Sequence, residues 1–228
     1  MAAASPIPLN QRPTIVKPPL PTPSHGSAGA VFSLTCSTVI NAPLTTILTS
    51  LLDTRAYPDW NAFVTSISIR SQPSAPASPP ACLADSPVLG LETTLQKGTS
   101  YTLHVKMDTK TNLFVGKNVD TTVVCSVLED FERDDGQPGV RVAWSLDSWT
   151  PGFMLKTERV QELVDVGGGA VEYRCFETFY GMLASTVRSF VGDSLQTGFG
   201  QWMDSLKAHA EKAAHESEQP TSTDPTVS

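Results

Sequence analysis

The sequence has few basic residues for its length. Its 228 residues include 16 Lys and Arg against 23 Asp and Glu, which gives a formal net charge of −7. A protein that neutralises nucleic-acid phosphates needs a basic patch, so this balance argues against a non-specific nucleic-acid binder. The sequence also lacks an apolar run of the ~18–20 residues that cross a membrane, and residues 1–20 lack the apolar core of a secretory signal. We therefore expect a cytoplasmic protein without a transmembrane segment.

Cysteine and histidine are scarce as well, with four of each. The cysteines are far apart and show neither a CxxC pair nor the Cys/His spacing of a zinc site. His25 and His215 fall in segments expected to be disordered, and His104 falls on the polar side of a strand pattern, where we expect it to face solvent. We therefore expect no metal site and no cofactor. Three cysteines fall inside strand patterns, where a free thiol packs as a small hydrophobe: Cys36, Cys125 and Cys175.

Proline-rich segments mark the parts of the chain expected to lie outside a packed core. Residues 1–29 are rich in proline and poor in large hydrophobic side chains, a composition that cannot offset the entropy cost of folding. We predict a disordered leader over 1–29, a single domain over 30–214 and a disordered tail over 215–228. Within the domain, residues 71–88 are rich in Pro, Ala and Ser and are predicted to form an inserted loop. The chain is expected to be a monomer.

The domain itself is predicted to consist of strands followed by one long helix. Residues 31–40 alternate apolar and hydroxyl side chains, which is typical of a half-buried strand, and two short helices are predicted within 43–52 and 57–63. Strands followed by a segregated helix indicate an α+β fold: a curved antiparallel sheet with the long C-terminal helix across its concave face. Further strands are predicted at 64–70, 92–96, 99–107, 121–131, 140–146, 155–166 and 171–179.

The predicted C-terminal helix spans about residues 180–214. Three glycines, Gly192, Gly198 and Gly200, interrupt it, each at a cost of about 1 kcal/mol relative to Ala. They indicate either close packing on the sheet or room for a ligand beneath the helix. Apolar side chains recur at helical spacing, namely Leu183, Val187, Phe190, Val191, Leu195, Phe199, Trp202 and Leu206.

Four short motifs follow one another along the chain: Phe32…Ile40-Asn-Ala-Pro43, Tyr57-Pro-Asp-Trp60-Asn-Ala-Phe63, Lys97-Gly-Thr99 and Glu177-Thr-Phe-Tyr-Gly181-Met-Leu183. In this order they resemble the START-like/Bet v 1-like superfamily (SRPBCC), and in particular its polyketide cyclase/dehydrase and lipid-transport group. The resemblance covers about residues 31–212. It implies a helix-grip fold with an apolar cavity between the sheet and the C-terminal helix, and a hydrophobic ligand such as a lipid, quinone, steroid or polyketide. It carries over no catalytic residue.

The triple glycine at 167–169 fixes a strand register. If it forms a three-residue hairpin loop, with glycine supplying positive φ, Val166 lies opposite Ala170. Counting outward then places Arg159 opposite Glu177 on the inner face. This pair is either a solvent-exposed ion pair or the buried polar anchor of the cavity. On the outer face the same register favours a cross-strand pair between Glu162 and Arg174.

Two functions are compatible with these features. The first is a carrier or sensor that binds a hydrophobic small molecule, and the second is a polyketide cyclase or dehydratase acting in the same cavity; a structural or interaction role is a third interpretation. A cyclase needs an acid or base near the reacting carbon, and no catalytic residue is identified. The residues expected to line the site are Trp60, Phe63, Tyr101, Leu103, Trp144, Phe153, Arg159, Tyr173, Glu177, Phe179, Phe190, Phe199 and Trp202.

Overall fold

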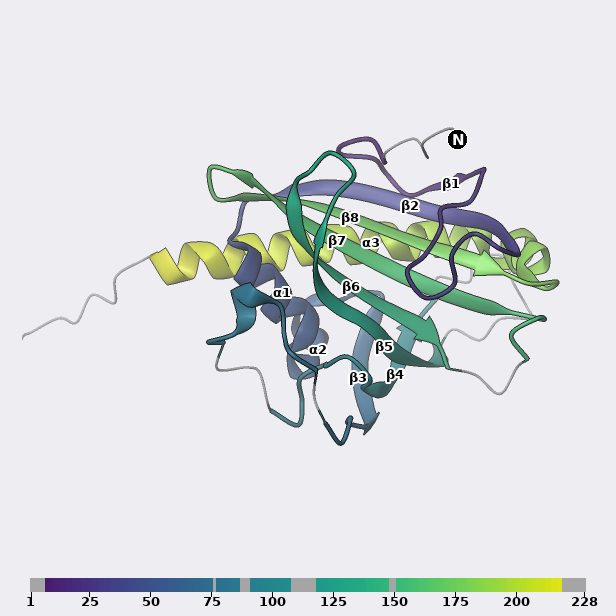
Figure 1. Cartoon of the computed structure of the whole chain (residues 1–228), viewed down its shortest axis with the longest axis horizontal. Coiled ribbons are helices and arrows are strands. Elements are labelled where there is room, and N and C mark those ends of the chain that lie inside the picture. Colours follow the sequence, from purple (N-terminus) through teal and green to yellow (C-terminus); the bar gives the residue numbers. More distant parts are fainter. Residues whose placement is uncertain (1–6, 76, 87–90, 108–117, 148–150, 219–228) are drawn as a thin grey trace, which may run out of the picture.

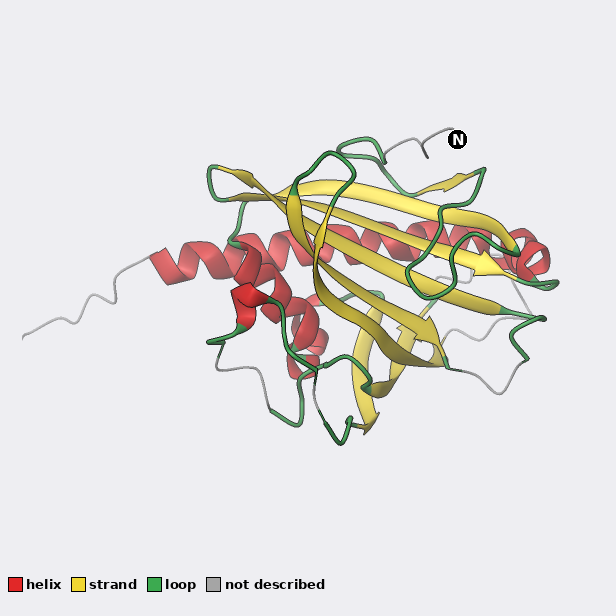
Figure 2. Ribbon diagram, viewed as in Figure 1, coloured by secondary structure: helices red, strands yellow, loops and turns green. Residues whose placement is uncertain are grey.

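The computed structural model describes residues 7–75, 77–86, 91–107, 118–147 and 151–218. Over these residues the chain forms one antiparallel sheet of eight strands, in the order β1-β2-β8-β7-β6-β5-β4-β3, with three α-helices (Figures 1 and 2). The helices are α1 (Leu44–Leu52), α2 (Tyr57–Trp60) and α3 (Ala184–Glu218). The strands are β1 (Thr14–Val16), β2 (Ala30–Ile40), β3 (Val64–Ser71), β4 (Ser100–Lys106), β5 (Asn118–Glu132), β6 (Pro138–Leu146), β7 (Lys156–Gly167) and β8 (Ala170–Tyr180).

The predicted helix-grip architecture is confirmed. Two short helices follow β2, and the chain ends in α3, 35 residues long, which lies behind the sheet in Figure 1 and packs on β2 and α1. Phe199, Trp202 and Leu206 in the second half of α3 are completely buried, whereas Leu183 and Phe190 near its start are exposed. The apolar stripe is therefore fully buried only in the second half of the helix, because there α1 and α2 join the sheet in covering it.

The glycines of α3 differ in what surrounds them. A Cβ atom on Gly198 would lie 2.2 Å from Cε2 of Phe63, a buried ring that packs directly on the helix backbone. A Cβ atom on Gly192 would meet Cδ1 of Ile15 at 3.6 Å and Cγ of Arg188 at 3.9 Å, both ordinary van der Waals contacts. Of the two interpretations of these glycines, close packing therefore holds for Gly198.

We expect Gly198→Ala to lower the free energy of unfolding by about 1–3 kcal/mol, because the added methyl group overlaps the Phe63 ring and forces a shift. Gly192→Ala in the same helix is the matched control. It is expected to raise stability by up to about 1 kcal/mol, since alanine favours the helix and the space is open. Chemical denaturation of both variants measures the difference, and equal effects would contradict a packing role for Gly198.

The hairpin between β7 and β8 has the predicted register but a different turn. Gly167 pairs with Ala170, so Gly168 and Gly169 form a two-residue turn with φ of +65° and +76°, as a type I′ turn requires. Val166 is left unpaired as a bulge. The bulge adds the residue that the shorter turn omits, so the pairs beyond it are those predicted, including Arg159 opposite Glu177.

The leader differs most from its prediction, because residues 7–29 pack on the sheet instead of standing apart as a disordered segment. β1 pairs with β2, and the segments on either side of it cover the convex face, which is the near side of the sheet in Figure 1. There the hydroxyl row of β2 bonds to the leader: Ser33 accepts from the Leu20 N–H at 2.8 Å, and Thr35 from Nε2 of Gln11 at 2.8 Å. Proline is tolerated in this segment because many of the segment's hydrogen bonds are made with side chains of β2 and β7.

A buried carboxylate on β7 also binds the leader. Glu158 of β7 is fully buried and accepts hydrogen bonds from N and Oγ of Ser24, at 2.9 and 2.6 Å, and from Oγ of Ser126 at 2.6 Å. Burial alone would raise the pKa of Glu158, but the hydrogen bonds from Ser126 and Ser24 outweigh it and hold the pKa below its usual value. The leader is thus held to the sheet by an ionised group that the sheet itself buries.

Three further segments differ from the predictions. Residues 92–96 form a turn with an isolated bridge between Thr94 and Asp53 rather than a strand of the sheet. Within the expected inserted loop, Leu83 is buried in the main core, so this loop is packed where the structure describes it. The last helix continues past 214 to Glu218, and residues 219–228 lie outside the described residues.

Candidate ligand-binding site

Three tryptophans from separate elements converge on the concave face. The ring of Trp202 on α3 lies 5.6 Å from that of Trp60 on α2 and 5.7 Å from that of Trp144 on β6, measured between centroids. The ring of Tyr101 on β4 lies 6.4 Å from Trp144. The ring of Phe63 packs against the backbone of α3 at Gly198, and Leu103 belongs to the same hydrophobic core. The structure therefore brings together most of the aromatic residues that the sequence assigned to the site.

A buried ion pair lies beside these rings. Nη2 of Arg159 on β7 is 3.1 Å from Oε2 of Glu177 on β8, and the two side chains are only 6% and 14% exposed. The guanidinium lies 3.9 Å from the ring centroid of Phe199 and 5.5 Å from that of Trp202, in cation–π contact with α3. Burial alone would lower the pKa of Arg159, but the raising contributions, led by the charge of Glu177, together outweigh it and raise the pKa, so the guanidinium stays charged. The pair is therefore buried, which agrees with its interpretation as a buried polar anchor and not with that of a solvent-exposed ion pair.

A chain of hydrogen bonds joins α3 to the sheet next to this pair. Nε1 of Trp202 donates to the hydroxyl of Tyr173 at 3.0 Å, and that hydroxyl donates to Oε1 of Gln161 at 2.7 Å. The sequence placed Gln161 on the inner face without assigning it to the site. It also missed Tyr57, whose ring lies 5.8 Å from that of Trp202 and whose hydroxyl donates to the Leu51 carbonyl at 2.9 Å.

Some polar atoms in this interior have no hydrogen-bond partner among the described residues. They include the hydroxyl of Tyr101, Nε2 of Gln161 and Nε1 of Trp60. Burial raises the pKa of Tyr101 well above its usual value, although the charge of Arg159 opposes the rise. The phenol therefore stays protonated and can donate a hydrogen bond. Buried polar groups without partners are uncommon in folded proteins, so these atoms identify a place where a ligand group or a water molecule could bind.

Three residues assigned to the site from the sequence lie elsewhere. Phe153, expected at a cavity rim, is 68% exposed, and Phe190 on α3 is 55% exposed. Phe190 precedes the part of α3 that α1 and α2 cover, which explains why helical spacing alone misplaced it. Phe179 is buried but stacks on Phe32 at 4.5 Å in a separate cluster near the start of α3. The site is therefore smaller than predicted and centred on Trp202.

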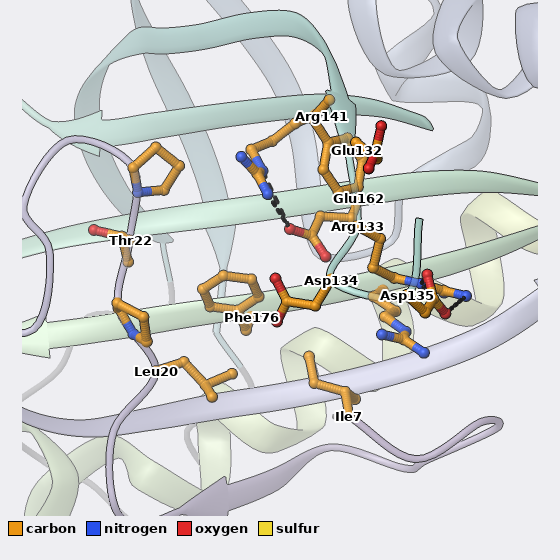
Figure 3. A pocket seen from close by; sticks show the side chains of 14 residues that line it. Ile7, Leu20, Thr22, Glu132, Arg133, Asp134, Asp135, Arg141, Glu162 and Phe176 are labelled. Atoms are coloured by element: carbon orange, nitrogen blue, oxygen red, sulfur yellow. Dashed lines mark hydrogen bonds and ion pairs between the residues drawn. The ribbon is translucent and has the colours of Figure 1, made fainter. Parts of the chain in front are cut away.

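A pocket of about 650 Å³ lies on the opposite, convex face, between the leader and the β5–β6 hairpin (Figure 3). Its apolar wall includes Ile7, Leu20 and Phe176. Its arginines are already paired: Arg141 with Glu162 at 2.8 Å, and Arg133 and Arg174 both with Glu172 at 2.7 Å. Glu162 lies opposite Arg174 as the register predicted, but the expected ion pair between them does not form, because Arg141 on the neighbouring strand β6 takes that carboxylate. Nothing in the sequence indicated this pocket, because the leader, which was predicted to be disordered, forms one of its walls.

No group of three or more His, Cys, Asp or Glu side chains is placed to hold a metal ion within the described part of the chain. Among the helices that the structure describes, none is long and apolar enough to cross a membrane.

Comparisons with known proteins bear on the fold. No protein-family model matches the chain. The chain is 28% identical over 184 residues to the "Oxopyrrolidines biosynthesis cluster protein O" of Penicillium oxalicum, covering 76% of this chain and 82% of the relative. Among solved structures, the Zhui aromatase/cyclase from Streptomyces sp. R1128 has a TM-score of 0.54 at 9% identity, over 82% of this chain and 98% of the other.

A second aromatase/cyclase structure, the di-domain StfQ of the steffimycin biosynthetic pathway, has a TM-score of 0.52 at 9% identity. The similar region covers 80% of this chain and 52% of that longer protein. At such low identity these structures bear on the fold alone. The sheet order, the two short helices after β2 and the long α3 agree with a helix-grip fold that the chain shares with these two structures.

Proposed function

We propose that the protein binds a hydrophobic small molecule with a ring carbonyl between α3 and the concave face of the sheet, as a carrier or sensor in natural-product biosynthesis. The observation that carries this proposal is the buried Tyr101 hydroxyl, which has no partner among the described residues and remains a donor. A buried donor left unsatisfied costs about 1–3 kcal/mol. A ligand carbonyl that accepts this hydrogen bond would recover that free energy, and the surrounding rings would cover its apolar part.

The relatives support the chemical class of this ligand. The Penicillium oxalicum protein is named for a cluster that makes oxopyrrolidines, which are cyclic amides with a ring carbonyl. The two solved structures of similar fold are named as aromatase/cyclases. Because the rings around Trp202 are in contact, the ligand would enter by separating α3 from the sheet. The exposed Leu183 and Phe190 make the start of the helix the less tightly held end.

Tyr101→Phe is expected to weaken ligand binding about tenfold while leaving stability unchanged or slightly higher, because it removes only an unsatisfied buried hydroxyl. Trp60, Trp144 and Trp202 report binding through quenching of their fluorescence, in titrations with a panel of oxopyrrolidines and aromatic polyketides. Tyr57→Phe is the matched control. Its hydroxyl is bonded to the Leu51 carbonyl, so this variant should lose about 1 kcal/mol of stability and keep its affinity.

Two results would contradict the proposal. One is equal affinity of Tyr101→Phe and the wild type for every ligand that quenches the tryptophans. The other is a wild-type protein that binds nothing in the panel and releases no small molecule on denaturation, as judged by native mass spectrometry of the freshly purified chain.

A cyclase or dehydratase acting on a natural-product intermediate is the second candidate function. The buried pair of Arg159 and Glu177 favours it, because it places a carboxylate and a cation beside the Tyr101 and Tyr173 phenols in one dry interior. An enzyme would change the mass of a bound polyketide by loss of water or change its absorption by closing a ring, whereas a carrier would return it unaltered. A cytoplasmic location and a monomeric state stay predictions of the sequence.

A further inference from the structure

Three polar side chains meet on the convex face of the sheet, at the end that the leader does not cover. They are Ser68 on β3, His104 on β4 and Asp120 on β5, three adjacent strands. Oγ of Ser68 is 2.8 Å from Nε2 of His104, and Nδ1 of His104 is 2.9 Å from Oδ1 of Asp120. The neighbours of His104 along β4, Leu103 and Val105, are buried in the core under α3. His104 therefore faces away from the ligand site proposed above.

The hydrogen bonds assign the protons. An ionised carboxylate only accepts hydrogen bonds, so Asp120 requires a proton on Nδ1 of His104. In the neutral imidazole, Nε2 then carries a lone pair, and the Ser68 hydroxyl donates to it. This order of contacts, serine to Nε2 and carboxylate to Nδ1, is the one that activates the nucleophile in serine hydrolases of unrelated folds, which are recognised by geometry rather than by sequence order.

We propose that Ser68, His104 and Asp120 form a second, esterolytic site on the convex face, independent of the ligand-binding function. Ser68 Oγ attacks the carbonyl carbon of an ester and passes its proton to Nε2 of His104. The C–O bond to the alcohol breaks, the alcohol leaves with that proton, and the acyl group stays on Ser68. A water molecule activated by His104 then releases the acid and restores the hydroxyl. Asp120 is a positioning residue that holds the imidazole in the required tautomer.

The surroundings define the substrate class. Ser68 and Asp120 are exposed and His104 is half-buried, so the serine is open to solvent and no apolar wall selects a long acyl chain. The site therefore suits small, unhindered esters.

The test combines covalent labelling with turnover of a chromogenic ester. The full-length chain is treated with a fluorophosphonate, which phosphonylates activated serines with loss of fluoride, and the adduct is located by peptide mass mapping. In parallel, release of p-nitrophenol from p-nitrophenyl acetate is measured. We expect one adduct on Ser68, and at least a tenfold loss of both labelling and turnover in Ser68→Ala and Asp120→Asn. Asp120→Glu should retain activity, because it restores the carboxylate, which a purely structural role for Asp120 would not explain.

Ser66→Ala is the matched control. Ser66 lies on the same strand opposite His104, and its hydroxyl makes no hydrogen bond to that imidazole, so this variant should behave as the wild type. Ser68 and Asp120 are exposed and Ser66 is half-buried, and unchanged melting temperatures confirm that all four variants fold. The proposal is overturned if the wild type labels no more than Ser68→Ala, if the adduct maps elsewhere, or if turnover is the same in all variants.

Discussion

Trp202→Ala is expected to lower the free energy of unfolding by about 3–5 kcal/mol, the range measured for large-to-small changes of buried aromatic residues. Trp202 is completely buried and contacts Trp60, Trp144 and Tyr57, and it donates a hydrogen bond to Tyr173. Its loss opens a cavity where α2, α3 and the sheet meet and leaves the guanidinium of Arg159 with one aromatic neighbour fewer. Chemical denaturation of the purified variant measures this loss.

Phe190→Ala is the control for this substitution, because it removes an aromatic ring from the same helix at an exposed position. We expect its cost to stay below about 1 kcal/mol. If the two substitutions proved equally harmful, the register of α3 on the sheet described above would be incorrect.

Glu177→Gln is expected to cost about 3 kcal/mol, because it leaves the buried guanidinium of Arg159 without its counter-charge. The value lies at the lower end of the range for buried pairs, since Glu177 keeps some contact with solvent. Replacing both partners, with Arg159→Met and Glu177→Leu together, should recover most of the loss, because no unpaired charge then remains in the interior. The difference between the single and double variants is measured by denaturation at neutral pH.

An exposed ion pair between the leader and α3 provides the comparison. Arg12 and Asp204 are 2.7 Å apart, with side chains 65% and 57% exposed. Asp204→Asn should therefore change stability by no more than about 1 kcal/mol. A loss in Glu177→Gln as small as this one would show that water reaches the Arg159 pair, and the polar anchor of the proposed ligand site would have to be abandoned.

The interior of the site was predictable to the extent that it depends on local pattern. Strand alternation and a single turn were enough to place Arg159 opposite Glu177 and Tyr173 on the inner face. The prediction succeeded although the turn has two residues rather than three, because the bulge at Val166 compensates for the difference. The same local pattern could not predict the hydrogen bond that Gln161 makes on the inner face, because its partner Tyr173 lies on the next strand.

The leader was missed because composition says nothing about a distant partner. A proline-rich segment without large hydrophobes has little to bury by itself. Here the hydroxyl side chains of β2 and the carboxylate of Glu158 lie on the convex face, and both accept hydrogen bonds from leader atoms. The alternation of apolar and hydroxyl side chains in β2 was interpreted as one buried face and one solvent-exposed face, whereas both faces are covered. Likewise, the convex pocket and the cluster of Ser68, His104 and Asp120 depend on which strands become neighbours.

The path of the leader along β2 also affects the tendency of the chain to associate with itself. Strand β1 pairs with residues 33–35 of β2, and beyond it the N–H groups of Ser37 and Val39 donate to Gln11 O and Asn10 Oδ1, at 3.0 and 3.2 Å. The leader therefore occupies the outer hydrogen-bonding edge of a long strand. A chain shortened to begin at Ala30 would present that edge open, with Phe176 uncovered beside it, and an open apolar edge is a template for strand pairing between molecules. By covering this edge, residues 7–29 thus oppose aggregation of the chain through strand pairing.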